Sequence, residues 1–119
     1  MIYVETITTP ANTTKKDPLK TTMVLKPGVI HRLEIQAPPG AEFLHHLIVK
    51  QGIYQMWPSG RGRDFALEDT NIEFDEWYEL PKNRAEIVVH TWNEDDTYAH
   101  IVIVRIGVLS KNVLLRKIF

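Results

Sequence analysis

Apolar and polar residues alternate with a period of two along most of this chain, and helical periodicity is scarce. In the range 29–36, for example, the apolar Leu33 and Ile35 alternate with the polar Glu34 and Gln36. Such alternation is typical of strands that bury one face and expose the other. The pattern predicts roughly eight strands, drawn from nine short runs at residues 2–8, 21–26, 29–36, 43–50, 53–57, 71–75, 77–80, 84–91 and 98–106.

Proline and glycine mark the connections between these strands. Pro27-Gly28 suits a tight turn between the second and third strands, because proline presets φ and glycine accepts a positive φ. Pro38-Pro39 ends the third strand, since proline cannot donate to a sheet ladder. Residues 58–63 are expected to form a loop, because proline, serine and glycine make up most of them.

The last two predicted strands are the strongest pair, and a polar turn separates them. If they form a hairpin, Val89 lies opposite Ile101 and Ile87 lies opposite Ile103. This register places four β-branched residues on one face, as the core of a sandwich requires.

Short strands at regular spacing predict an all-β fold, a single-domain antiparallel β-sandwich. A jelly roll is the preferred topology, and an immunoglobulin-like topology is the alternative. The length of 119 residues and the mass of 13.8 kDa fit one such domain. We expect the sandwich over residues 19–107, an extended N-terminal arm over 1–18 and an apolar C-terminal tail over 108–119.

Composition excludes several classes of protein. The chain is 44% apolar and 24% charged, as globular proteins are, and it has no cysteine for disulfides, thiolate metal sites or nucleophiles. The apolar run at 101–104 is far too short to span a membrane, and the first residues lack the basic start and apolar stretch of a secretory signal. A net charge of −1 argues against binding nucleic acid.

Charge is unevenly distributed along the chain. Residues 1–63 carry eight Lys/Arg against four Asp/Glu, residues 64–96 carry two against eleven, and residues 97–119 carry four against none. An acidic middle between basic ends can steer contact with a complementary surface, including that of a second copy. The simpler interpretation is that these charges only solvate loops.

Neither end of the chain fits the predicted sandwich. Residues 8–18 are rich in threonine and lysine and have no apolar face, so they should form an arm that is ordered only when a partner receives it. Residues 108–119 contain apolar side chains up to the final phenylalanine. This tail either closes the core or docks on a neighbouring molecule.

The five histidines are the candidates for metal binding or catalysis. His45 and His46 are adjacent in a strand, so their side chains point to opposite faces. His90 and His100 face each other in the predicted hairpin, but no further ligand stands at a motif spacing. His31 stands alone. We therefore expect no catalytic residue, metal or cofactor, and a metal enzyme of the cupin type is a further alternative.

Two loops carry concentrated charge. The acidic turn at 93–96 lacks the spacer residues and the glycine of a calcium loop, so a solvated turn is preferred. Arg61 and Arg63 could bind phosphate or acidic side chains, but the glycine pattern and the following helix of a phosphate loop are missing.

Aromatic residues could form a sugar-binding face, although core and rim packing is their usual role. A carbohydrate-binding module would need two or three coplanar, exposed rings. The candidates are Tyr54, Trp57, Trp77, Tyr78 and Trp92.

Several stretches of the chain resemble small all-β structural proteins of tailed bacteriophages, of the type that decorates or cements a capsid. The resemblance implies a β-sandwich, often trimeric, that is bound to the outside of a capsid lattice and reaches a neighbour with an arm. It implies no catalytic residues. The stretches are TTPANT at 8–13, LKTT at 19–22, LEIQAPPG at 33–40, YQMWPS at 54–59 and NEDDTYAH at 93–100.

Residues and resemblance together predict a non-catalytic structural protein, made in the bacterial cytoplasm and located on the capsid surface of a virion. Its expected partners are itself, as a homotrimer, and a major capsid protein lattice, without nucleic acid, membrane or cofactor. A carbohydrate-binding β-sandwich module is the alternative function. The residues expected at assembly contacts are Thr8, Thr9, Pro10, Asn12, Lys15, Lys16, Arg61, Arg63, Asp95, Asp96, Leu115 and Phe119.

Overall fold

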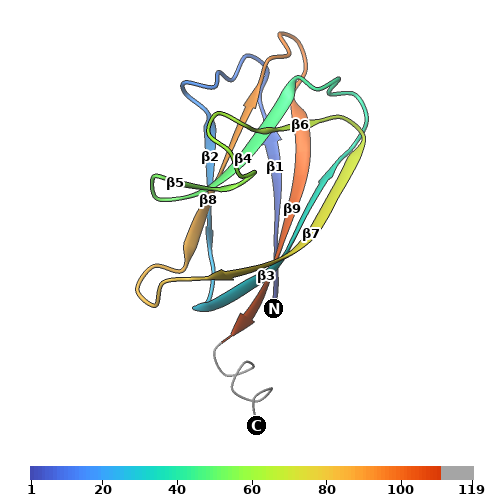
Figure 1. Ribbon diagram of the computed structural model, residues 1–119. Coiled ribbons are helices and arrows are strands. Elements are labelled where there is room, and N and C mark those ends of the chain that lie inside the picture. The colour runs from blue at the N-terminus through green and yellow to red at the C-terminus, as the bar shows by residue number, and fades with distance from the viewer. Residues whose placement is uncertain (111–119) are drawn as a thin grey trace.

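Nine β-strands build the part of the chain that the computed structural model describes, residues 1–110 (Figure 1). Nothing helical within this range has the length and hydropathy of a membrane-spanning segment. The strands are β1 (Ile2–Thr9), β2 (Leu19–Val24), β3 (Gly28–Ala37), β4 (His45–Gln51), β5 (Tyr54–Trp57), β6 (Phe65–Leu67), β7 (Thr70–Glu79), β8 (Glu86–Asn93) and β9 (His100–Ser110).

The strands form two antiparallel sheets, which confirms the predicted all-β sandwich. The first sheet has the order β1-β9-β3-β7, and the second has the order β2-β8-β4-β5 with β6 paired to β4. The pairing is nested along the chain, because β1 pairs with β9, β2 with β8, β3 with β7 and β4 with β5. The chain thus resembles one long hairpin that is rolled up into two sheets. This arrangement is like that of a jelly roll.

Inward-facing side chains of both sheets form one hydrophobic core. Along β3, Leu33 and Ile35 are fully buried while Arg32 and Glu34 lie on the outer face, as the alternation predicts. The largest contributions from the other strands come from Leu47, Val49, Ile87, Val89, Val102, Val104 and Ile106, all of which are completely buried.

The predicted hairpin of the last two strands is wrong, because β8 and β9 lie in different sheets. Val89 pairs with Thr21 and Val49, and Ile101 pairs with Thr8. The turn at Pro27-Gly28 likewise connects the two sheets rather than two neighbours of one sheet. By contrast, the predicted pairing of 43–50 with 53–57 is confirmed by β4 and β5.

The face of β9 that points inward also differs from the prediction. Val102 and Val104 are fully buried, whereas Ile101 is 45% exposed. Residues 101–104 are all β-branched, so alternation within them cannot show which ones face the core. Arg105 is four residues from Ile101, so both lie on the same face of β9, and this face points outward. The charge of Arg105 is therefore the feature of the sequence that indicates which face of β9 is exposed.

β1 is an edge strand of the first sheet and pairs with β9 over its whole length. Its Ile7 is only 3% exposed and joins the core. Half of the segment expected as an arm is thus a strand of this chain's own sandwich. The threonines of this strand are β-branched, and β-branched residues favour strands. The other half, residues 10–18, connects β1 to β2, and we call it the strap. Leu115 and Phe119 of the expected tail lie outside the described residues.

Candidate functional site

A cluster of buried polar side chains occupies one end of the sandwich, where β1 and β8 end and β4 and β9 begin. Thr9, His45, Thr91 and Asn93 are fully buried there. The Thr9 hydroxyl donates to Oγ1 of Thr91 at 2.8 Å, and His45 Nε2 lies 2.8 Å from Thr9 Oγ1. Because the Thr9 proton is already donated, His45 Nε2–H is the donor to Thr9. The cluster therefore ties β1, β4 and β8 together.

His45 is held neutral by this environment. Its pKa is lowered from 6.5 to about 4, chiefly by burial and in addition by the nearby His100 and His46. Its Nδ1 has no hydrogen-bond partner among residues 1–110. The rings of His45 and His100 lie 6.1 Å apart between centroids.

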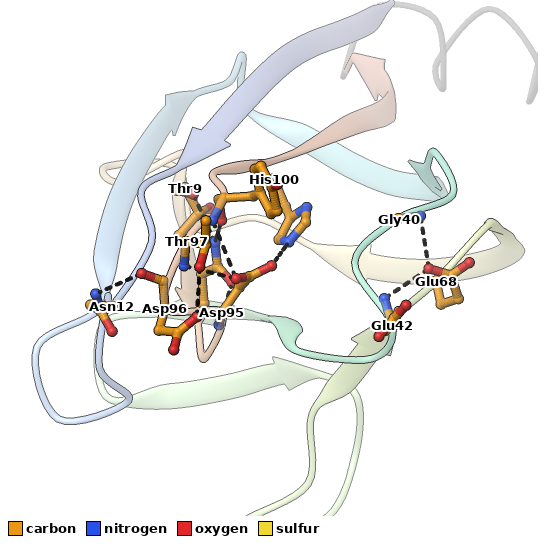
Figure 2. Close-up of polar contacts among 11 residues, drawn as sticks. Thr9, Asn12, Gly40, Glu42, Glu68, Asp95, Asp96, Thr97 and His100 are labelled. Carbon is orange, nitrogen blue, oxygen red and sulfur yellow. Dashed lines mark hydrogen bonds and ion pairs between the residues drawn. The ribbon is translucent and has the colours of Figure 1, made fainter.

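Asp95 organises the turn between β8 and β9 (Figure 2). Its Oδ1 accepts the backbone N–H groups of Thr97 at 2.9 Å and Tyr98 at 3.2 Å, while Oδ2 lies 2.8 Å from His100 Nε2. The pKa of Asp95 is lowered, first by the Thr97 N–H and then by the His100 side chain. Asn93 donates to the carbonyls of Thr9 and Tyr98, which joins the turn to the buried cluster.

The strap is fastened to this turn by backbone hydrogen bonds. Asn12 N–H donates to the Asp95 carbonyl at 2.9 Å, and Asn93 N–H donates to the Thr13 carbonyl at 2.9 Å. The Asn12 side chain also donates to the Asp96 carbonyl at 3.4 Å. Asn12 has φ of 59°, in the left-handed region that asparagine tolerates better than most residues. The strap is therefore held by hydrogen bonds to its own chain.

Glu68 fixes the neighbouring loop between β3 and β4 at the same end (Figure 2). Its Oε1 accepts the backbone N–H groups of Glu42 at 2.8 Å and Gly40 at 2.9 Å. These bonds, that of Glu42 first, lower the pKa of Glu68. Its carboxylate thus holds the loop in place.

The structure brings only part of the predicted assembly residues together. Thr9, Asn12, Asp95 and Asp96 meet at the fastened turn, and Thr13 binds the Pro10 carbonyl beside them at 2.7 Å. Thr8 faces outward from β1 and is exposed.

The basic residues of the strap line a groove on the outer face of the second sheet. It has a volume of about 270 Å³, and we call it the lysine groove. Within residues 1–110 none of its lysines forms an ion pair with a carboxylate. Lys15 lies 5.6 Å above the Trp92 ring. The groove is lined by Lys15, Lys16, Pro18, Lys20, Ile48, Lys50, His90 and Trp92.

The predicted pairing of His90 with His100 is wrong. His90 belongs to the second sheet, where Lys20 and Ile48 flank it, whereas His100 starts β9 in the first sheet. Burial lowers the pKa of His90, and the nearby Lys50 and Lys20 act in the same direction. Among the described residues no group of three His, Asp or Glu side chains is arranged to hold a metal ion.

The loop with Arg61 and Arg63 lies beside a second hollow of about 460 Å³, which Lys50, Tyr54 and Arg61 help to line. The carbonyls of Pro58 and Arg63 accept the side-chain amide of Gln55 at 2.8 and 3.0 Å. This loop is therefore anchored to β5.

The aromatic residues do not form one flat face. Trp57 and Trp92 are 4% and 3% exposed, so neither ring is available as a platform. Tyr54 is exposed and stacks against Tyr78 at 6.5 Å between ring centroids, while Trp77 is exposed on β7.

Sequence reasoning missed the buried polar cluster, although a signal was present. Thr9, Thr91 and His45 are each two residues from a core residue of the same strand, namely Ile7, Val89 and Leu47. A period of two therefore places all three polar side chains inside the sandwich, where they must find partners.

A scan against protein-family models, a search of curated proteins and a search of solved structures each gave no match.

Proposed function

We propose that this protein is a non-catalytic structural component that works by self-association and decorates or cements the capsid of a tailed bacteriophage. The observation that carries the proposal is an uncharged stripe along the edge of the first sheet. On β1 the stripe consists of Ile2, Val4, Thr6 and Thr8. On the neighbouring β9 it is flanked by Ile101 and Ile103 opposite Thr8 and Thr6, and by one charged residue, Arg105, opposite Val4.

This stripe has the properties of a contact surface. Ile2 is 72% exposed and Val4 is 55% exposed, on a strand whose outer edge pairs with no other strand among residues 1–110. Exposed apolar edge strands are templates for pairing with another chain, and proteins usually protect them with charge. A second copy that covers this edge would bury the apolar side chains and satisfy the backbone.

The virion setting is supported by the resemblance of the sequence and by the fold. Jelly rolls occur in viral capsid proteins, but also in lectins and cupins, so the architecture alone does not select a function. The buried polar cluster around Thr9 and His45 favours a structural role over catalysis, because its hydrogen bonds join strands of both sheets.

The proposal is tested by measuring the mass of the full chain in solution by sedimentation velocity. We expect wild-type protein to form oligomers and Val4→Lys to weaken them by about tenfold or more in dissociation constant, because an ammonium group in the interface must be desolvated. Ile53→Lys is the matched control, since Ile53 is 99% exposed at the tip between β4 and β5 and lies outside the stripe. A wild-type monomer at all concentrations would overturn self-association.

The virion setting has its own test. Mass spectrometry of purified phage particles that encode the chain should detect it as a stoichiometric capsid component. Its absence from the particles would remove the virion from the proposal.

A carbohydrate-binding module is the second candidate, because exposed Tyr54 lines the hollow beside Arg61 and Lys50. Glycan-array binding that Tyr54→Ala abolishes and Trp77→Ala preserves would favour it over self-association. Trp77 is the matched control, since both rings are 59% exposed.

A further inference from the structure

The lysine groove has a counterpart of opposite charge on the other sheet. Strand β7 forms one edge of the first sheet, and its exposed residues include four acids around an exposed tryptophan. The acids are Glu73, Asp75, Glu76 and Glu79, and the tryptophan is Trp77.

Part of this acidic strand is neutralised within the chain, and part is free. Arg32 binds Glu73 at 2.9 Å and Asp75 at 3.0 Å. The side chain of Asp75 is nevertheless 85% exposed. Glu79 forms no ion pair within residues 1–110. The segment 75–79 therefore presents negative charge on both sides of Trp77, which is 59% exposed.

We propose that the lysine groove of one copy binds the acidic segment 75–79 of β7 from a second copy. The groove supplies four ammonium groups, and its lining includes the apolar residues Ile48 and Pro18. Carboxylates of the incoming strand would meet the lysines while Trp77 covers these apolar lining residues. This inference rests on the proposed self-association and names one of its contacts.

The contact is head-to-tail, because the groove and β7 belong to opposite sheets of the same molecule. A heterologous contact of this kind generates closed rings or open chains of copies. It also gives the acidic middle of the sequence and the lysines of the strap a shared role, since opposite charges steer the approach of the copies.

Charge exchange between two variants tests the contact. The groove variant carries Lys16→Glu and Lys20→Glu, and the strand variant carries Asp75→Lys and Glu79→Lys. In the groove variant the two new glutamates cancel the two remaining lysines, Lys15 and Lys50, so the attraction for the acidic strand is removed. In the strand variant the groove and the segment 75–79 are both positive, so head-to-tail binding should be lost in that variant as well. In an equal mixture the native groove of the strand variant meets the native acidic strand of the groove variant.

We expect the mixture to form assemblies larger than either variant forms alone, as measured by mass photometry at about 0.05 M NaCl. For wild-type protein, the apparent dissociation constant of self-association should rise by about tenfold or more at about 0.5 M NaCl, because salt screens the attraction between the groove and the acidic strand. Lys26→Glu with Lys82→Glu makes the same change in charge at exposed sites outside the groove and should associate like wild type.

The outcomes separate this contact from the proposed function. A mixture no larger than its separate variants, with association still sensitive to Val4→Lys, overturns the groove contact and leaves self-association standing. A wild-type chain that stays monomeric overturns both. Binding by wild type that salt does not weaken also overturns the groove contact.

Discussion

Thr9 is the residue on which the buried cluster depends, because its one hydroxyl serves both His45 and Thr91. Thr9→Val keeps the shape and the β-branch but leaves both partners without that hydroxyl. We expect the free energy of unfolding to fall by about 1–3 kcal/mol, as measured by urea denaturation. Thr8→Val is the control, since Thr8 faces solvent on the same strand. Equal stability of Thr9→Val and wild type would contradict this role.

His45 should make stability dependent on pH. Its pKa is about 4 when folded and about 6.5 as an ordinary histidine, so between these values the unfolded chain binds a proton that the folded chain does not. The stabilisation is therefore complete above pH 6.5 and is lost as the pH falls towards 4, by up to about 3 kcal/mol.

Urea denaturation at several pH values measures this effect. His45→Gln removes the titrating ring and should flatten the dependence of unfolding free energy on pH between about 4 and 6.5. Identical slopes for the variant and wild type would show that other groups control the response.

At the scale of elements, β1 decides whether the N-terminal segment is an arm or part of the fold. Eight residue pairs join β1 to β9, and Ile7 lies in the core. Ile7→Ala should lower the thermal stability and cost about 2–4 kcal/mol, because it leaves a cavity. Ile2→Ala, on the exposed face, should cost little. If both variants unfold like wild type, β1 does not contribute to the stability of the isolated chain.

The same strands show why local patterns gave the elements but not their neighbours. Alternation located β3, β4 and β8 within a few residues of their actual bounds. Two predicted strands at 71–75 and 77–80 are one strand, β7, and the short β6 was missed. Alternation describes the two faces of a strand, whereas pairing depends on which edges meet in space.

At the scale of the whole molecule, nested pairing should make folding slow. β1 and β9 come from opposite ends of the described chain, with Ile2 opposite Gly107. Folds dominated by such distant pairings reach the native state in milliseconds to seconds. Stopped-flow tryptophan fluorescence after dilution from urea measures the rate, with Trp57 and Trp92 buried as reporters. Completion of folding within microseconds would contradict this expectation.

The sequence by itself determined the all-β class and the polar and apolar faces of most strands, because both follow from a period of two. It also showed the uneven charge. Only the tertiary structure decided that β8 and β9 belong to opposite sheets and that Thr9, His45 and Thr91 share one cluster. It also placed the strap lysines around one groove. These arrangements join residues far apart in the chain, so closure of the whole sandwich is what brings them into contact.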